Sequence, residues 1–172
     1  MRRLLAILTM LGALSISQAS VAGAGSPTEA SATLDGHRIE LQRVSDYHCH
    51  DLDYPVIRCY RSAEDLDRAI ADRVARDPGS PGAEGTAGLA YVRVYTDASY
   101  GGTSLLISTP YDHLGSVGWN DRISSFKTLT STGGTFYQHD LGTGWAYPFC
   151  CTSAVPYVGD AYNDQFSSVY AN

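Results

Sequence analysis

The hexapeptide Asn-Asp-Arg-Ile-Ser-Ser occupies residues 120–125, and Asn-Asp-Gln-Phe-Ser-Ser follows it at residues 163–168, 43 positions later. Four of the six positions are identical in the two copies. A repeat at a fixed spacing indicates a fold assembled from copies of one supersecondary unit. The sequence therefore predicts two related structural units in the C-terminal half of the chain.

Each hexapeptide is preceded by an aromatic stretch that ends in glycine. Residues 95–102 read Tyr-Thr-Asp-Ala-Ser-Tyr-Gly-Gly, and their counterpart at residues 137–144 has Gly142 where the second aromatic residue would stand. A tight turn requires positive φ at one position, which Gly102 and Gly144 can adopt because they lack a Cβ. We expect Tyr95 and Tyr100 to pack over the first turn. The missing ring at position 142 predicts a looser and more exposed second hairpin.

The two paired elements resemble the βγ-crystallin superfamily. Its Greek-key units each carry an aromatic hairpin ending in glycine and then an Asn/Asp, Asn/Asp, any, any, Ser/Thr, Ser hexapeptide. The resemblance covers about residues 91–172, with units at about 91–130 and 134–172. It implies a mainly β fold, in which a sandwich of two Greek keys follows a small N-terminal α+β accessory segment.

The resemblance also implies calcium binding, because in microbial members of the family the hexapeptides supply calcium ligands and exchange them between the two motifs. Calcium takes oxygen ligands and tolerates flexible geometry. Carried over by position, the candidates are the carboxylates of Asp121 and Asp164, the carbonyls of Arg122 and Gln165, and the hydroxyls of Ser124 and Ser167. Ser125 and Ser168 are expected to support the hairpins.

Two observations weigh on this ligand set. The Arg122 guanidinium opposes a nearby cation unless it points into solvent, so the site that uses its carbonyl is expected to be the weaker one. In the alternative interpretation, the hexapeptides are turn staples whose serine hydroxyls bond backbone atoms rather than metal.

Residues 1–24 have the features of a secretory signal peptide. Arg2 and Arg3 precede an apolar run over residues 4–16, and small residues follow at 22–24. The run is too short for a stable membrane span. We therefore expect a secreted, extracellular protein with no membrane contact after cleavage.

The charge of the mature chain argues against nucleic acid as a partner. Cleavage would leave 10 of the 12 basic residues and all 18 acidic ones, which moves the net charge from −6 to −8. A protein that binds nucleic acid needs a basic face. The acidic balance is instead compatible with binding calcium ions.

A segment rich in proline and glycine, residues 78–88, is predicted to be a linker between an accessory region at 25–77 and the β domain at 89–172. In the accessory region, a strand is expected over residues 37–42 and another over 54–60. A helix should follow, capped by Ser62, with apolar residues on one face at Leu66, Ala69, Ile70 and Val74. The region is too small for a large core of its own, so we expect it to dock on the sandwich.

Four cysteines in a secreted protein indicate two disulfides. The favoured pairing links Cys49 and Cys59 to the adjacent Cys150 and Cys151, which would staple the accessory region to the sandwich. The alternative is one hairpin bridge between Cys49 and Cys59, with Cys150 and Cys151 either bonded to each other or free.

No sequence motif supports an enzyme. The cluster at residues 48–53, His-Cys-His-Asp-Leu-Asp, could ligate zinc or nickel, but an oxidised Cys49 could not. Some secreted bacterial members that the chain resembles inhibit metallopeptidases with a disulfide-supported loop, and related members are killer-toxin-like. The loop at residues 150–156 could act in this way or be a structural connection. The predicted function is a secreted, non-enzymatic, calcium-binding protein stabilised by calcium and disulfides; the alternative is an inhibitor of an extracellular metallopeptidase, or a killer-toxin-like protein.

Overall fold

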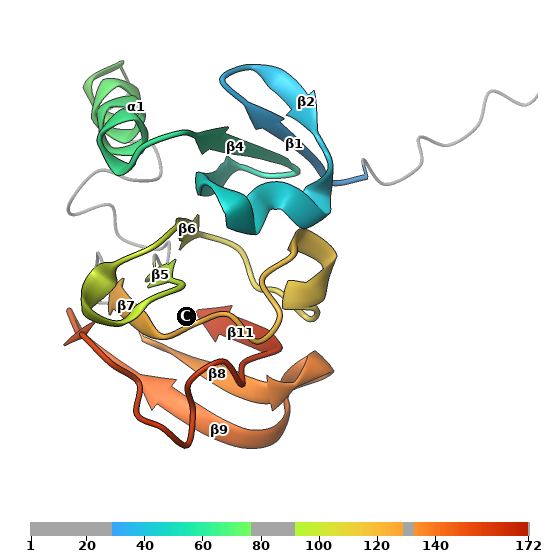
Figure 1. The fold of residues 1–172 in the computed structure, drawn as a ribbon, viewed down its shortest axis with the longest axis vertical. Coiled ribbons are helices and arrows are strands. Elements are labelled where there is room, and N and C mark those ends of the chain that lie inside the picture. The colour runs from blue at the N-terminus through green and yellow to red at the C-terminus, as the bar shows by residue number, and fades with distance from the viewer. Residues whose placement is uncertain (1–28, 77–91, 129–132, 172) are drawn as a thin grey trace, which may run out of the picture.

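The computed structural model describes residues 29–76, 92–128 and 133–171. The predicted signal peptide and the predicted linker both lie outside these residues. The described chain is mainly β, as predicted, with two sheets and one α-helix (Figure 1). None of its helices is both long enough and apolar enough to cross a membrane.

The C-terminal part contains two Greek-key units that are connected by main-chain pairing. The first sheet holds β5 (Val92–Tyr95), β6 (Ser104–Ile107) and β7 (Ser125–Thr128); the second holds β8 (Gly134–His139), β9 (Thr143–Phe149) and β11 (Ser168–Ala171). The short strand β10 (Ala154–Val155) follows β9 in the chain but pairs with β7 of the first sheet. In return, Tyr111 of the first unit bridges to Val169 of β11. The first sheet therefore takes a short strand from the second unit, and the second sheet takes a one-residue bridge from the first.

The core of this sandwich is made of aromatic residues contributed by both units. Phe136, Phe166 and Phe126 are each completely buried. The ring of Phe136 lies 5.2 Å from that of Phe126 and 4.9 Å from that of Phe166, measured between centroids. Alternating side chains on the inner faces of two packed sheets produce such a core.

The accessory segment forms four strands, a 3₁₀ helix and an α-helix. Its elements are β1 (Ser31–Leu34), β2 (His37–Ile39), a 3₁₀ helix (Leu41–Asp46), β3 (His48–Asp53), β4 (Val56–Tyr60) and α1 (Ala63–Arg76). The strand expected over residues 37–42 is shorter than predicted, because the chain turns into the 3₁₀ helix at Leu41. The strand predicted at 54–60 is found as β4, and its partner β3 was not predicted.

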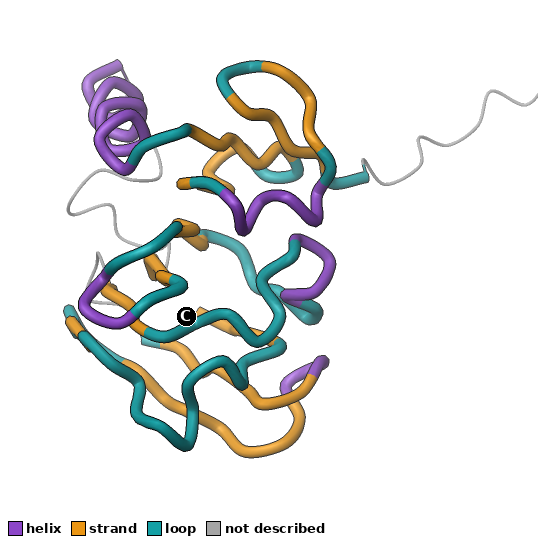
Figure 2. Tube along the Cα trace, viewed as in Figure 1, coloured by secondary structure: helices purple, strands orange, loops and turns teal. Residues whose placement is uncertain are grey.

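The accessory segment packs on the sandwich by continuing its first sheet. β3 pairs in parallel with β6, so one sheet of eight strands runs in the order β10-β7-β5-β6-β3-β4-β1-β2. Figure 2 shows the strands of this segment, in orange, beside those of the sandwich. Main-chain pairing therefore joins the two parts, in addition to side-chain contacts.

Helix α1 begins as the sequence predicts. The Ser62 hydroxyl accepts the backbone N–H of Asp65 at 3.2 Å, which satisfies one of the free donors of the first turn. Leu66 on the predicted apolar face is fully buried, and Ile70 packs against Leu52 and Leu106 in a small second core. The helix thus covers part of the eight-stranded sheet.

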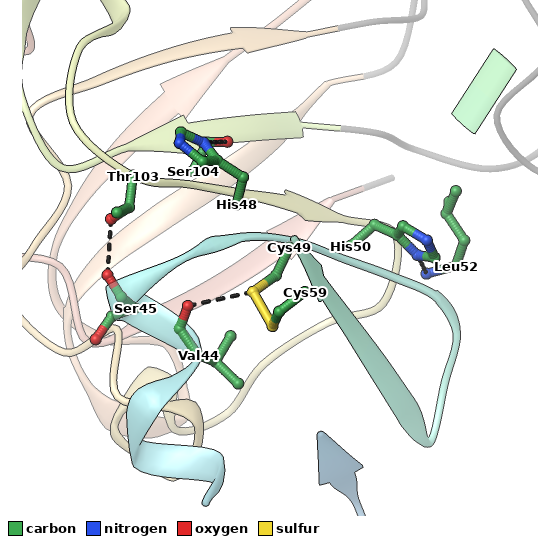
Figure 3. The surroundings of a disulfide bond; sticks show 9 residues. All are labelled: Val44, Ser45, His48, Cys49, His50, Leu52, Cys59, Thr103 and Ser104. Atoms are coloured by element: carbon green, nitrogen blue, oxygen red, sulfur yellow. Dashed lines mark hydrogen bonds between the residues drawn. A yellow bond between two sulfur atoms is a disulfide. The ribbon is translucent and has the colours of Figure 1, made fainter. Parts of the chain in front are cut away.

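The disulfide pairing differs from the favoured prediction. Cys49 of β3 bonds Cys59 of β4, its direct neighbour across the hairpin (Figure 3), and Cys150 bonds Cys151. The favoured links between the accessory region and residues 150–151 are therefore wrong, and the alternative of a hairpin bridge with a bonded neighbouring pair is the one observed. Sheet pairing takes over the joining role that those links were expected to have.

Peptide mapping of the unreduced protein is expected to give a bridged pair containing Cys49 and Cys59 and a single peptide with both Cys150 and Cys151. Replacing Cys49 and Cys59 with alanine should lower the free energy of unfolding by about 3 kcal/mol, because the bridge closes a loop of about ten residues. A peptide linking either hairpin cysteine to Cys150 or Cys151 would contradict this pairing.

Candidate metal centre

In the first unit, the two serines of the hexapeptide staple the aromatic hairpin. The Ser124 hydroxyl donates to the carbonyl of Thr96 at 2.7 Å, and the Ser125 hydroxyl donates to the carbonyl of Asp97 at 2.6 Å. Ser125 also accepts the N–H of Tyr100 at 3.1 Å. The hairpin is therefore held to its own hexapeptide by side chains 25 to 28 residues away.

The second unit repeats this arrangement. The Ser167 hydroxyl donates to the carbonyl of Gln138 at 2.8 Å, the Ser168 hydroxyl donates to the carbonyl of His139 at 2.7 Å, and Ser168 accepts the N–H of Gly142 at 3.0 Å. The turn-staple role expected for the hexapeptides is thus present in both units. It does not exclude metal binding, because a hydroxyl that donates one hydrogen bond keeps lone pairs for a cation.

The two aspartates of the hexapeptides adopt the same unusual backbone conformation. Asp121 has φ of 54° and Asp164 has φ of 56°, in the left-handed region that Asp and Asn tolerate best among residues with a Cβ. The amide of the preceding residue, Asn120 or Asn163, donates to the carboxylate in each case, at 2.6 and 2.8 Å. Each carboxylate is therefore oriented by its own motif.

The backbone connects the two motifs reciprocally. The N–H of Asp121 donates to the carbonyl of Phe166 at 3.0 Å, and the N–H of Asp164 donates to the carbonyl of Ile123 at 3.3 Å. The Asp164 carboxylate also lies 3.5 Å from the hydroxyl of Ser124, which belongs to the other motif. A carboxylate of one unit therefore faces the hydroxyl of the other, as an exchange of ligands requires.

An open cavity of about 480 Å³ lies at this junction, lined by Thr96, Asp97, Asn120, Asp121, Arg122 and Asp164. The structure thus brings Asp121, Arg122 and Asp164 together, with Ser124 in contact with Asp164. Gln165 and Ser167 occupy the equivalent positions of the other half and do not line this cavity. The exposed Arg122 side chain leaves room for its guanidinium to lie in solvent.

The electrostatics of the junction favour a cation. Partial burial raises the pKa of Asp121 above its ordinary value, and the negative charges of Asp164 and Asp140 raise it further. Like charges held close together are relieved by an opposite charge between them. Within the described ranges, no three His, Cys, Asp or Glu side chains gather as a metal-holding group. A cation here would therefore need hydroxyl and carbonyl oxygens besides the carboxylates, which suits calcium better than zinc.

The hairpin glycines behave as predicted, but the second hairpin differs in one respect. Gly102 and Gly144 have φ of 68° and 80°, and Tyr95 packs edge-on against Tyr100 with centroids 5.6 Å apart. In the second unit, Tyr170 packs against Tyr137 at 5.8 Å and lies against Gly142, where a Cβ would be 3.1 Å from its ring.

Sequence reasoning missed this role of Tyr170. Tyr170 stands two residues after the second hexapeptide, and Lys127 stands at the same position after the first. The Lys127 ammonium lies 4.0 Å from the centroid of the Tyr100 ring, so in both units this position contacts the hairpin. The second hairpin does carry an exposed tip, with Leu141 61% exposed. The missing ring is nevertheless replaced from another strand.

The cluster at residues 48–53 is divided among different tasks. Cys49 is oxidised, His48 shares a 3.1 Å hydrogen bond with the hydroxyl of Ser104, and the buried Asp51 accepts hydrogen bonds from Ser108. A zinc or nickel site that uses the Cys49 thiolate is excluded because that sulfur is in a disulfide.

Comparison with known proteins gives matches to solved structures alone. No protein-family model matches the chain, and no curated protein matches it. A βγ-crystallin domain from Clostridium beijerinckii is 30% identical, with 47% of this chain and 95% of that domain covered and a TM-score of 0.43. A βγ-crystallin from an archaeon is 25% identical, with 49% and 100% covered and a TM-score of 0.44. A domain from Flavobacterium johnsoniae is 24% identical, with 47% and 92% covered and a TM-score of 0.42.

These matches span nearly the whole of each domain but about half of this chain. The chain's own geometry carries the conclusion about its fold: the hexapeptide occurs twice, each copy staples a hairpin, and strand β10 of the second unit pairs with β7 of the first. Residues 92–128 and 133–171 therefore form a two-Greek-key, βγ-crystallin-like domain.

Proposed function

We propose that this is a secreted, non-enzymatic protein whose βγ-crystallin-like domain binds calcium at the junction of its two hexapeptides. The observation that carries the proposal is the crossed contact between the Asp164 carboxylate and the Ser124 hydroxyl, beside the Asp121 carboxylate. Oxygen donors from two sequence-distant motifs converge on one open cavity with an excess of negative charge. Binding of calcium would join the two units and stabilise the domain.

The ligand set of the proposal follows the two motifs. Each ion would take the carboxylate of Asp121 or Asp164, the carbonyl of Arg122 or Gln165, and the hydroxyl of the opposite motif, with water completing the shell. Sites of this kind in extracellular modules work at dissociation constants of order 0.1 to 1 mM. The proposal therefore needs only weak sites, because the predicted signal peptide would direct the protein outside the cell.

Calorimetric titration of the metal-stripped mature protein with calcium, followed by thermal melts with calcium and with chelator, tests the proposal. We expect two binding sites and a raised melting temperature, since a ligand at a hundred times its dissociation constant adds about 2.7 kcal/mol per site. The variant Asp121→Ala/Asp164→Ala should lose both responses.

A matched control is Glu40→Ala/Asp46→Ala, which removes two exposed carboxylates from the accessory segment. It should keep the calcium response of the native protein. The assignment would be overturned if calcium titration of the native protein gave no heat of binding, or if the variant that lacks Asp121 and Asp164 bound calcium fully. The hexapeptides would then act only as turn staples.

A second candidate function is inhibition of an extracellular metallopeptidase by the loop at residues 150–156. In its favour, Cys150, Cys151 and Thr152 are exposed, and the turn is fixed because Thr128 and Ser153 hydrogen-bond each other through backbone and side chain. However, Ala154–Val155 is the exchanged strand β10, so part of this loop has a structural task. Inhibition constants measured against a panel of secreted thermolysin-like enzymes decide this candidate, and absence of inhibition at micromolar protein would reject it.

A further inference from the structure

A second cavity lies in the accessory segment, between α1 and the hairpin of β3 and β4, well apart from the hexapeptides in sequence. Its volume is about 640 Å³, and three arginines line it: Arg58 from β4, and Arg73 and Arg76 from successive turns of α1. His50 and Tyr60 complete the hairpin wall. Two carboxylates, those of Asp53 and Asp72, line the same cavity, so the three arginines exceed them by one positive charge.

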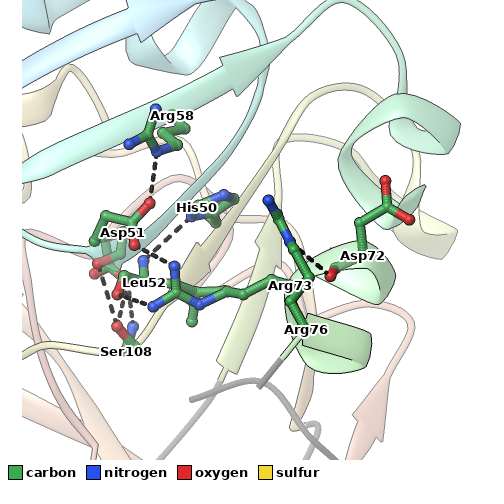
Figure 4. Close-up of polar contacts among 9 residues, drawn as sticks. His50, Asp51, Leu52, Arg58, Asp72, Arg73, Arg76 and Ser108 are labelled. Carbon is green, nitrogen blue, oxygen red and sulfur yellow. Dashed lines mark hydrogen bonds and ion pairs between the residues drawn. The ribbon is translucent and has the colours of Figure 1, made fainter. Parts of the chain in front are cut away.

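The carboxylate of Asp53 satisfies part of this positive charge. The register of β3 against β4 shifts between His50 and Asp53, and both residues line the cavity. Asp53 accepts a hydrogen bond from Arg58 at 2.5 Å and another from Arg73, so one carboxylate is shared by two guanidinium groups. Figure 4 shows Arg73 reaching from α1 to the hairpin beside Leu52. Arg76 therefore carries the positive charge that Asp53 does not pair, although Asp72 lies in the same lining.

Arg76 and Arg73 carry further N–H donors that have no acceptor among the described residues. Arg76 donates through Nε to the carbonyl of Asp72 at 3.0 Å, and no contact is found for its two terminal nitrogens. Arg73 Nε is buried and has no acceptor. A buried donor that lacks an acceptor, such as Arg73 Nε, is costly. The Arg76 side chain is exposed, so its terminal nitrogens are accessible to a ligand.

His50 adds a neutral donor at the same wall. The His50 residue is only 3% exposed, and its Nδ1 accepts a hydrogen bond from the backbone N–H of Leu52 at 3.3 Å. The proton of the neutral ring is therefore on Nε2, which acts as a donor. Tyr60, with its ring centroid 6.1 Å from that of His50, offers a hydroxyl on the same side.

We propose that this cavity binds a small oxyanion, either a phosphate or a carboxylate group, held by the guanidinium groups of Arg76, Arg73 and Arg58 with the His50 imidazole as a neutral donor. The planar fork of arginine matches both anions and can donate two parallel hydrogen bonds to either. The site lies on the accessory segment and is independent of the calcium proposal. It gives this segment a binding task of its own.

The test is a titration of the metal-stripped, mature protein with inorganic phosphate and, separately, with citrate, at constant ionic strength set with sodium chloride. Binding is followed by the amide and histidine resonances in NMR spectra. We expect saturable shifts at His50, Tyr60 and Arg76, with chloride unable to produce them. A response to phosphate alone, to citrate alone, or to both identifies the anion, and each supports the site.

The decisive variant is Arg76→Gln. Among the residues that the structure describes, Arg76 bonds only a backbone carbonyl of its own helix, so its loss should not unfold the segment. Its matched control is Arg61→Gln, which removes the same charge from a side chain that is 72% exposed and paired with Asp35 away from the cavity. We expect at least tenfold weaker binding in the first and native binding in the second. No saturable response to either anion, or equal weakening in both variants, would overturn the proposal.

Discussion

The contribution of Asp51 to stability is expected to fall by about 3 kcal/mol as pH rises from about 4 to about 6. Asp51 is completely buried, and burial raises its pKa from 3.8 to about 6, although hydrogen bonds from Ser108 and Thr109 oppose the rise. In this window the folded protein keeps a proton that the unfolded chain has lost, so stability decreases with increasing pH. A shift of about two pKa units corresponds to about 3 kcal/mol.

The neighbouring residue His50 has the opposite effect on how stability changes with pH. Burial lowers the pKa of His50 from 6.5 to about 4, with further lowering by Arg73 and Arg58, against the carboxylate of Asp53. Between these two pKa values the unfolded chain binds a proton at His50 that the folded protein does not bind. Stability therefore increases with pH across nearly the same window as that of Asp51. The two contributions offset each other, so the native protein should show little net dependence from this pair.

Urea unfolding between pH 3.5 and 7.5 separates the two contributions when the native protein is compared with Asp51→Asn and His50→Gln. The stability difference between native protein and Asp51→Asn should change by about 3 kcal/mol over the window. Direct NMR titration of the Asp51 carboxyl carbon provides the same answer in the native protein, and a midpoint near 4 would contradict the expectation.

Replacing Phe136 with alanine is expected to lower the free energy of unfolding by about 3 to 5 kcal/mol. Phe136 is completely buried and its ring contacts three others, those of Phe126, Phe149 and Phe166, at 5.2, 4.8 and 4.9 Å between centroids. Phe126 belongs to the first sheet and the other two to the second unit. The substitution therefore opens a cavity at the contact between the two Greek keys.

Denaturant unfolding of calcium-free protein measures this effect. Leu141→Ala serves as the control, because Leu141 is 61% exposed at the tip of the hairpin formed by β8 and β9, and its loss should cost less than about 0.5 kcal/mol. Since a single domain of this size is stable by about 5 to 15 kcal/mol, the Phe136 variant should lose a large part of its stability. A loss below 1 kcal/mol would mean that Phe136 does not hold the units together.

The repeat-containing half of the fold could be predicted because its signals are local. The left-handed turns at Gly102 and Gly144 depend on the absence of a Cβ at those positions. In the accessory segment, the Ser62 cap was predictable for the same reason, because it depends on a residue three positions away. The doubled hexapeptide identified both copies of the staple, and the ligand set placed on it stays a prediction, although Asp121 and Asp164 do meet at one cavity.

The remaining features could not be predicted because they depend on partners far away in the chain. Strand β3 pairs with β6, whose residues lie 56 positions later. The residues around His48 contain no pattern that indicates this pairing. Tyr170 replaces the ring missing at Gly142 from a different strand. The cavity of Arg58, Arg73 and Arg76 exists only once the helix has folded over the hairpin.

The amino-acid sequence alone determined that two related units occur, where their tight turns lie and where the helix is capped, because hydrogen bonding and φ preferences act over a few residues. The Greek-key form of the units was predicted from their resemblance to βγ-crystallins. Only the tertiary structure determined which strands share a sheet, which cysteines form disulfides and which charged side chains lie close together. These pairings depend on the closing of long loops and on competition for a free sheet edge. Cys49 illustrates the difference. Its oxidation was expected in a secreted chain, but its partner became Cys59 because hairpin pairing placed their Cα atoms 4.0 Å apart.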